Sequence, residues 1–419
     1  MVGAGWAGLA AAVEGTARGA QVTLYETAHR AGGRSRTLGQ GDRRHDNGQH
    51  ILIGAYSATL GLMRDVGLDP EALLHRLPLV LAGPDGQGLV LRPGPPALAF
   101  ALAVLRQHHW PWGHRLALLL RAARWRLQGF VCPAHWTVSE LCAGLPDGVV
   151  KGLLDPLCVA ALNTSIEQAS AQVFLRVLRD AVFGGPGSAD LLLPRAPLSD
   201  LLPEPALGWL RQRGAHVRLG QRVQTLSPDP TGGWRVNADP HDQVVLACSC
   251  TEAARLVAEL APAWAAIATQ IRHEPIVTMW LRDPHLQLPY PMVALPATPG
   301  MPSPAQFAFD LGALGQTPGH FTFVVSTAAP LLEQGLAALT EQVLAQARWH
   351  FVGHFLQDDT VVHTAAERRA TFSCTPGLVR TPARIAHGLM AAGDHVEGPY
   401  PGTLEGAVRA GREAAKALV

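Results

Sequence analysis

A glycine-rich segment at the start of the chain constrains its fold more than any other feature. The segment Gly3-Ala-Gly5-Trp-Ala-Gly8 has the pattern G-x-G-x-x-G, and the sequence predicts a helix directly after it and a strand at residues 22–26. In such a unit the first glycine permits a tight turn, the second lets the backbone approach a pyrophosphate, and the third allows close packing of helix on strand. The helix N-terminus then offers free N–H groups to the phosphates. The segment predicts a Rossmann-like α/β domain with a dinucleotide site.

An acidic residue at the end of the strand narrows the choice of nucleotide. Glu26 can accept hydrogen bonds from ribose hydroxyls, and its negative charge would repel a 2′-phosphate. This argues against NADP. The residues expected to line this part of the site are Gly3, Gly5, Trp6, Ala7, Gly8 and Glu26. A structural glycine turn followed by an incidental glutamate is the alternative interpretation.

The segment before the glycines is unusually short for this fold. Only Met1 and Val2 precede Gly3, whereas a strand usually has about five or six residues. We therefore expect a clipped first strand and a natural start that lies upstream of Met1.

Length and composition set wider bounds. The chain has 419 residues, of which 48% are hydrophobic and 16% charged, and this favours two domains with large cores. A net charge of +1 gives no general case for nucleic-acid binding. The six cysteines show no zinc-binding spacing, so reduced thiols and no metal site are expected. No signal peptide is expected, and no apolar run reaches the ~18 residues that a membrane span needs.

Further elements can be predicted along the chain. We expect a helix that ends at Gly214, a loop over the proline-rich residues 284–305, and a final helix from about Thr403. Strands are predicted at residues 217–219, 222–226, 234–236 and 243–247.

Two motifs at opposite ends of the chain indicate which dinucleotide is bound. Gly32-Gly33-Arg34 follows Glu26, and Gly393-Asp394 precedes the final helix. These motifs, in this order, resemble those of the amine-oxidase and phytoene-desaturase superfamily of flavoproteins. The resemblance implies FAD, with Arg34 near the pyrophosphate and Asp394 bonded to the ribityl chain. The remaining cofactor residues that it implies are Gly33, Val223, Gly393, Thr403 and Leu404.

The resemblance also implies a fold class and a division of the chain. The expected class is α/β, with a glutathione-reductase-like, Rossmann-like FAD-binding domain and a discontinuous substrate domain of mixed sheet and helices. The FAD-binding domain is expected at residues 1–60, 201–262 and 386–419, and the substrate domain at 61–200 and 263–385, of which 61–200 would also face the membrane.

Three further stretches resemble one family within this superfamily. Residues 46–56, 155–164 and 401–411 are similar to the hydroxysqualene dehydroxylase family of bacterial hopanoid synthesis. The resemblance implies reductive removal of the hydroxyl group of hydroxysqualene to give squalene. It also places Gly48, Gln49 and His50 beside the flavin.

The implied chemistry needs a proton donor and a dry pocket. The C–O bond is allylic, so a cation becomes accessible when the hydroxyl group leaves as water, and reduced flavin then delivers a hydride. Asp46, His50 and Asp155 are the candidate acids in the family-like stretches. Structural alternatives remain open, because Asp46 could cap a turn, His50 could pack beside the flavin, and Asp155 could cap a helix that has Pro156 at its first position.

A basic and apolar stretch stands out in the first half of the chain. Residues 86–139 contain no Asp or Glu but are rich in Leu, Arg and Trp. Apolar helices with arginines and flanking tryptophans suit a membrane interface with anionic lipids. We therefore expect peripheral association through residues 98–130, at the inner face of the cytoplasmic membrane. A helical cap over a hydrophobic tunnel is the alternative.

Other functions on the same scaffold remain open. A carotenoid desaturase would oxidise its substrate, and an amine oxidase would use an aromatic cage at the flavin, for which Tyr400 is a candidate. An isoprenoid-binding carrier would need no complete FAD site. The resemblance to hydroxysqualene dehydroxylases implies a long-chain isoprenoid substrate that a hydroxysqualene synthase hands over. No nucleic-acid partner is expected, and the electron donor is left open.

Overall fold

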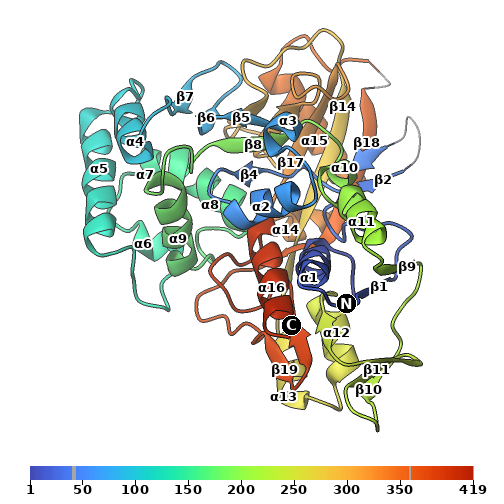
Figure 1. Cartoon of the computed structure of the whole chain (residues 1–419). Helices are drawn as coiled ribbons and strands as arrows, with labels where there is room; N and C mark the ends of the chain where they lie inside the picture. The colour runs from blue at the N-terminus through green and yellow to red at the C-terminus, as the bar shows by residue number, and fades with distance from the viewer. Residues whose placement is uncertain (40–43, 358–359, 419) are drawn as a thin grey trace.

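A mostly parallel sheet forms the first layer of the computed structural model, which describes residues 1–39, 44–357 and 360–418 (Figure 1). Val2 makes parallel bridges to Tyr25 and Leu246 and thereby joins two parts of this sheet. In spatial order the strands are β9 (His216–Leu219), β1 (Thr23–Glu26), Val2, β13 (Val244–Leu246), β20 (Leu389–Ala391) and β19 (Arg384–Ala386). β19 alone among these runs antiparallel to its neighbour. The predicted Rossmann-like fold class is confirmed.

The centre of this sheet is held by very few residues. The Val2 N–H donates to Val245 O at 2.8 Å, and the Gly3 N–H donates to Tyr25 O at 2.7 Å. The Ala247 N–H donates to Val2 O, and the Tyr25 N–H donates to Met1 O. The glycine turn therefore follows a single bridging residue rather than a strand of ordinary length.

Helices pack closely on both sides of this sheet. They are α1 (Trp6–Ala17), α11 (Pro203–Gln212), α12 (Cys250–Val257), α13 (Pro262–Thr269) and α16 (Leu404–Lys416). α1 and α16 approach so closely that a Cβ on Gly411 would lie 2.1 Å from the Ala7 carbonyl oxygen. The final helix begins where the sequence predicts it, with Thr403 Oγ1 accepting from Gly406 N–H at 3.0 Å.

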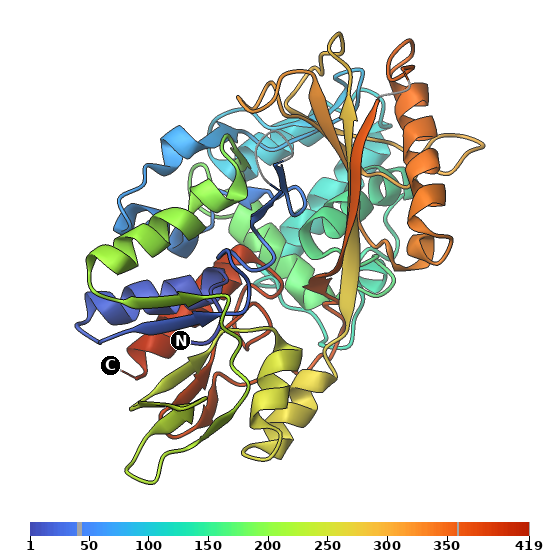
Figure 2. The ribbon, with the colours of Figure 1, turned by 90° about the vertical axis from the view of Figure 1, so that its right-hand side faces the viewer.

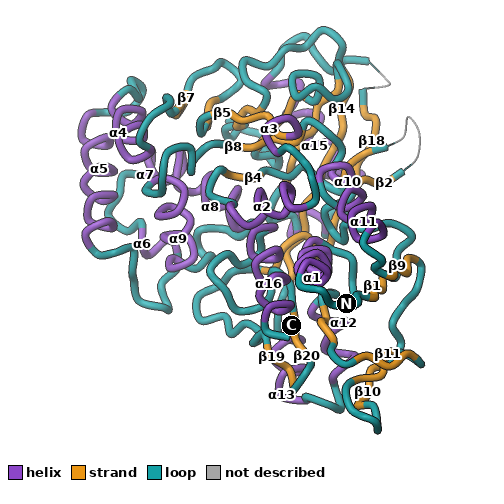
Figure 3. Tube along the Cα trace, viewed as in Figure 1, coloured by secondary structure: helices purple, strands orange, loops and turns teal. Residues whose placement is uncertain are grey.

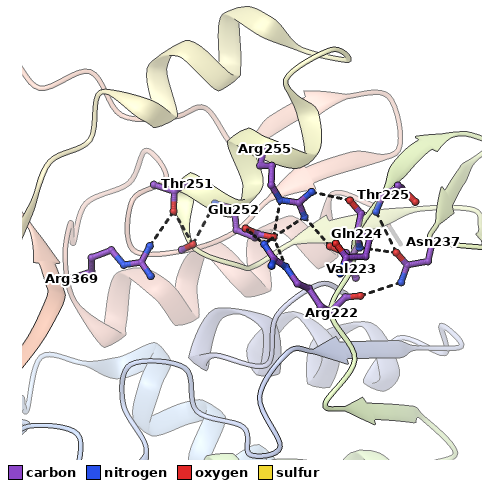
Figure 4. A network of polar contacts seen from close by, with 10 residues as sticks. Arg222, Val223, Gln224, Thr225, Asn237, Thr251, Glu252, Arg255 and Arg369 are labelled. Atoms are coloured by element: carbon purple, nitrogen blue, oxygen red, sulfur yellow. Dashed lines mark hydrogen bonds and ion pairs between the residues drawn. The ribbon is translucent and has the colours of Figure 1, made fainter.

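The prediction of a strand over residues 222–226 is wrong for most of its length. β10 spans only Leu226–Pro228 and forms a small antiparallel sheet with β11 (Trp234–Val236) and β12 (Asp239–His241). Before β10, side chains replace the strand partner (Figure 4). Asn237 Oδ1 accepts from the N–H groups of residues 224 and 225, and the Arg255 guanidinium donates to the carbonyls of 223 and 224.

An antiparallel sheet forms the second layer. Its order is β15 (Met292–Ala294), β16 (Phe307–Asp310), β17 (His320–Val325), β14 (His273–Arg282) and β18 (Val361–Phe372). β15 lies inside the proline-rich stretch, so the prediction of a continuous loop there is wrong. α15 (Leu336–His350) runs along one face of the sheet (Figure 2). Val277 and Met279 of β14 belong to the same hydrophobic core as Leu339 and Val343 of α15. The side chains on the opposite face of β14 and β18 are therefore not covered by α15.

Helices dominate the third part of the molecule (Figure 3). They share one hydrophobic core with residues of the short strands beside them and comprise α4 (Pro96–Leu105), α5 (Trp112–Leu127), α6 (Val138–Leu141), α7 (Asp147–Val149), the π-helical turn η2 (Val150–Leu154), α8 (Asp155–Leu162) and α9 (Ala171–Val182). Within the described ranges, no helix is long and apolar enough to cross a membrane. The division of the chain into five domain segments stays a prediction.

Short elements connect these parts. The strands are β2 (Thr37–Leu38), β3 (His45–Asp46), β4 (Leu52–Ile53), β5 (Leu74–Leu77), β6 (Val80–Ala82), β7 (Gly88–Val90) and β8 (Leu191–Pro194). The helices are α2 (Ser57–Asp65), α3 (Pro70–Leu73), α10 (Leu198–Leu201) and α14 (Ala329–Leu332).

Candidate active site

A cavity of about 680 Å³ lies between the two sheets and receives residues from all three parts of the molecule. Nearly all the cofactor residues expected from the sequence line it. They are Gly3, Gly5, Trp6, Ala7, Glu26, Gly33, Arg34, Gly48, Gln49, His50, Val223, Gly393, Asp394, Thr403 and Leu404. Gly8 does not line the cavity, and a Cβ there would lie 1.8 Å from Gly3 O and 3.2 Å from Ala247 Cβ. Its position matches the predicted role of packing helix on strand.

The glycine turn opens the N-terminus of α1 to the cavity. Gly3 has φ +102°, a conformation that favours glycine, and Gly5 precedes the helix without any side-chain cap. The Gly5 backbone faces Gly33, where an added Cβ would lie only 3.1 Å from Gly5 Cα. Because Gly5 and Gly33 have no side chains, a pyrophosphate can approach the backbone amide groups between them.

Glu26 is held rigidly at the end of β1. One carboxylate oxygen accepts from Ala4 N–H at 2.7 Å and the other accepts from Ala28 N–H at 2.8 Å. Each oxygen has a second acceptor position. The carboxylate is therefore oriented to accept ribose hydroxyl protons, as the sequence predicts.

An ion pair joins the two flavoprotein motifs across the cavity. Arg34 donates to Asp394 at 2.5 Å and to Ala370 O at 3.0 Å. Burial alone would raise the pKa of Asp394, but the Arg34 charge, the nearby His395 imidazole and the hydrogen bond from Arg34 outweigh it and hold that pKa below its usual range. Asp394 thus stays ionised and fixed beside the cavity.

His50 lies at the cavity with both ring nitrogens engaged. Nε2 lies 2.7 Å from Ser35 Oγ, and Nδ1 lies 3.2 Å from Gly48 O. Because a carbonyl only accepts, Nδ1 carries the proton and Nε2 accepts from the serine hydroxyl. Burial lowers the pKa of His50, against a smaller opposing effect of the Gly48 carbonyl. His50 is therefore neutral at pH 7, and its two hydrogen bonds fix the orientation of its ring at the cavity.

The other two candidate acids lie outside the cavity lining. Asp46 accepts from Thr37 Oγ1 at 2.7 Å and from Leu198 N–H at 3.0 Å, so it caps the start of α10. Asp155 is the first residue of α8, and burial followed by the Glu167 charge raises its pKa. The structure brings neither carboxyl group to the cofactor residues.

Sequence reasoning missed a carboxyl group that does line the cavity. Glu367 on β18 accepts from Asn47 Nδ2 at 2.9 Å, and Asn47 also donates to Arg34 O at 2.8 Å. Asn163 also lines the cavity and donates to Thr371 Oγ1 at 3.0 Å. The strand alternation of β18 is the one signal that could have indicated Glu367.

The donors and acceptors fit a dinucleotide with a flavin ring. Free amides of α1, the Glu26 carboxylate and the N-terminus of α16 all open on the same cavity. His395 Nε2 also lines it and is buried without a hydrogen-bond partner among the described residues. A bound polar molecule would satisfy this atom.

The fold and the site define an FAD-dependent oxidoreductase. The chain belongs to the family of flavin-containing amine oxidoreductases, whose family model matches residues 6–419. It is 26% identical to a hydroxysqualene dehydroxylase of Sinorhizobium fredii over 99% of this chain and 96% of that protein. It is 27% identical to a hydroxysqualene dehydroxylase of Rhodopseudomonas palustris, with 99% and 96% of the two chains covered. A solved oxidoreductase of Methanosarcina mazei shares its fold, with a TM-score of 0.74, 16% identity and 99% of both chains covered.

Proposed function

We propose that this enzyme reductively removes the hydroxyl group of hydroxysqualene and releases squalene. The observation that carries the proposal is the likeness to hydroxysqualene dehydroxylases over 99% of the chain. The cavity supports it, because its lining includes the apolar residues Ile51, Val159, Ala160, Ala161, Ile276 and Ala365. An isoprenoid chain offers no hydrogen-bonding groups along its length and suits such a wall.

The reaction balances with one proton and one hydride. The allylic C–O bond breaks, its electron pair leaves with oxygen as water after protonation, and the carbon receives a hydride. FAD, when bound in its reduced form, supplies that hydride. The protein must therefore supply a proton at the leaving oxygen, hold the isoprenoid chain and exclude other water.

Glu367 is the carboxyl group best placed to supply the proton. Four carboxyl groups line the cavity in the described part of the chain, those of Glu26, Glu252, Glu367 and Asp394. Glu252 is paired with Arg222 and Arg255, Asp394 with Arg34, and Glu26 lies at the phosphate-binding turn. Glu367 has neutral hydrogen-bond donors only, and Asn47 fixes its orientation. It also lies on the substrate-domain sheet, opposite Ile276.

Replacing Glu367 by Gln is expected to lower squalene formation by about 100-fold or more while the protein keeps its flavin. A positioned general acid contributes roughly 10²–10⁴ in rate, and Gln preserves the contact with Asn47 without a transferable proton. Mass spectrometry of the product and the flavin absorbance of the purified variant measure both quantities. Asp46→Asn and Asp155→Asn serve as controls that should retain activity. Full activity of Glu367→Gln would remove Glu367 from the mechanism.

Two alternatives on this scaffold are less consistent with the site. Tyr400, the candidate for an aromatic cage, does not line the cavity, and its ring packs under the guanidinium of Arg409 at 4.9 Å. A carrier without redox chemistry would not need Glu26, Arg34 and Asp394 arranged around one cavity. A desaturase would need the same cavity but would reduce the flavin rather than oxidise it.

A substrate panel tests the proposal directly. The purified flavoprotein is incubated with hydroxysqualene, phytoene or a primary amine, and the products are identified by mass spectrometry. We expect squalene from hydroxysqualene and no turnover of the other two. Conversion of phytoene or the amine, with hydroxysqualene unchanged, would replace this function with a desaturase or an oxidase. Hydroxysqualene is insoluble in water. We therefore propose that a hydroxysqualene synthase transfers it to this enzyme at the inner face of the cytoplasmic membrane.

A further inference from the structure

Two neighbouring helices of the helical part expose apolar side chains to solvent. α4 and α5 contact each other and lie at the edge of the molecule (Figure 1). The exposed residues, here called the α4–α5 face, are Leu98, Leu102, Leu105, Trp112, Leu116, Leu120 and Leu127. Trp112 is 70% exposed and Leu120 is 62% exposed. Isolated exposed leucines are ordinary, but a contiguous set of this kind marks an interaction surface.

The spacing of these residues shows that they form stripes. On α4 the exposed positions recur every three or four residues, and Ala99, Phe100, Ala103 and Val104 face the core. α5 repeats the pattern, with Leu118, Ala122 and Trp125 buried on its inner side. Each helix is therefore apolar on both faces, and its outer stripe has no partner among the described residues.

The arginines around this face divide into two groups. Arg115 donates to the carbonyls of Trp110 and Leu105, and Arg121 donates to those of Leu141 and Ala143, so both stabilise the helical fold. The second group is exposed, and its side chains make no hydrogen bond or ion pair within the described ranges. It consists of Arg92, Arg106, Arg124 and Arg126, and the guanidinium of Arg126 lies over the Phe183 ring at 5.8 Å. Residues 86–139 contain no Asp or Glu, and Glu140 is the first acidic residue after them. The face is therefore positively charged.

We propose that the α4–α5 face docks on the surface of an anionic phospholipid bilayer. Apolar stripes that enter the acyl boundary, with arginines at headgroup level, are the features that bind an amphipathic surface to such a membrane. The docked helices share one core with α8, whose residues Val159, Ala160 and Ala161 line the active-site cavity.

Vesicle flotation with the full-length flavoprotein tests this proposal. We expect binding to vesicles of phosphatidylcholine with phosphatidylglycerol, weaker binding to phosphatidylcholine alone, and partial release by salt. Replacing both Leu116 and Leu120 by Ser should weaken binding at least about tenfold, because both side chains leave water on docking. Arg106→Glu combined with Arg124→Glu should abolish the preference for anionic vesicles.

Matched controls distinguish specific docking of the α4–α5 face from nonspecific hydrophobic adsorption and from self-association of the protein. Trp349 and Val352 are also exposed, at the end of α15, and replacing both by Ser should leave vesicle binding unchanged. Equal loss in this control, or unchanged binding of the Leu116→Ser, Leu120→Ser variant, would overturn the proposal. So would a lipid-free dimer, seen by light scattering, that the same leucine variant converts to monomer. Melting temperature and flavin content confirm that each variant is folded.

Discussion

Replacing Asp394 by Ala is expected to yield a protein that loses its FAD on purification. Asp394 is buried, ionised and bonded to Arg34 at 2.5 Å, and both residues line the cavity. Removing the carboxylate deletes a charge-assisted hydrogen bond of about 1.5–3 kcal/mol and frees Arg34 to leave its position. The flavin affinity should fall by about 100-fold, which corresponds to roughly 2.8 kcal/mol. Fluorescence of released flavin after gel filtration measures the occupancy.

Two further variants show whether charge or shape matters at this position. Asp394→Asn keeps the side-chain volume and an acceptor oxygen, so we expect an intermediate loss. Glu26→Ala should also lower flavin occupancy, because it removes the acceptor for the ribose hydroxyls while the Arg34–Asp394 pair stays intact. Full flavin content in both Asp394→Ala and Glu26→Ala would contradict the cofactor site described above.

The same ion pair is expected to make the stability of the protein depend on pH in the acid range. The pKa of Asp394 is lower in the folded protein than its ordinary value of 3.8, so its contribution to stability is fully present above that value. The contribution is lost as the pH falls below it toward the folded pKa. The Asp394→Asn variant should therefore lose less stability than the unmodified protein over this acid range.

Replacing Glu405 by Ala is expected to destabilise the fold by about 1–3 kcal/mol for each buried donor that loses its acceptor. Glu405 lies on α16 and is fully buried, and it accepts from the N–H groups of Ala58 and Thr59 at 3.0 and 2.9 Å. It therefore caps α2, which has no side-chain cap of its own. It also accepts from Arg409 Nε at 2.7 Å. Alanine would leave two amides and the guanidinium without this acceptor.

Thermal and denaturant unfolding measure this loss. Glu405→Gln is the matched control, because it keeps an acceptor oxygen for the amides but lacks the charge for Arg409, and it should cost less than the alanine change. A melting temperature of Glu405→Ala equal to that of the unmodified protein would show that α2 does not depend on this contact.

The cofactor site could be predicted from sequence because its key parts are local. The glycine turn and Glu26 lie within one strand-turn-helix unit, where the spacing of a few residues fixes the geometry. The ion pair between Arg34 and Asp394 joins residues far apart in the chain. Resemblance to known motifs predicted each residue at the cofactor but not the contact between them, because sequence spacing carries no information on such a contact.

The catalytic group could not be predicted in the same way. Asp46 and Asp155 are titratable residues in suggestive stretches, but the sequence does not show that Leu198 N–H binds Asp46 or that Asp155 begins a helix outside the cavity. Glu367 faces the cavity only because β18 pairs with β14 in one register. A shift by one residue would reverse its orientation. The arginines of residues 86–139, which the sequence places at a membrane interface only as an expectation, show the same limit, because Arg121 donates to backbone carbonyls.

An anaerobic single-turnover experiment shows whether the reduced flavin of this enzyme delivers its electrons to hydroxysqualene. The purified protein is reduced with dithionite, the excess is removed, and hydroxysqualene is added in the absence of oxygen. We predict that the absorption of oxidised flavin returns and that one squalene forms for each flavin oxidised. A flavin that stays reduced, with hydroxysqualene recovered unchanged from a folded and fully loaded protein, would contradict the assignment as a reductive dehydroxylase.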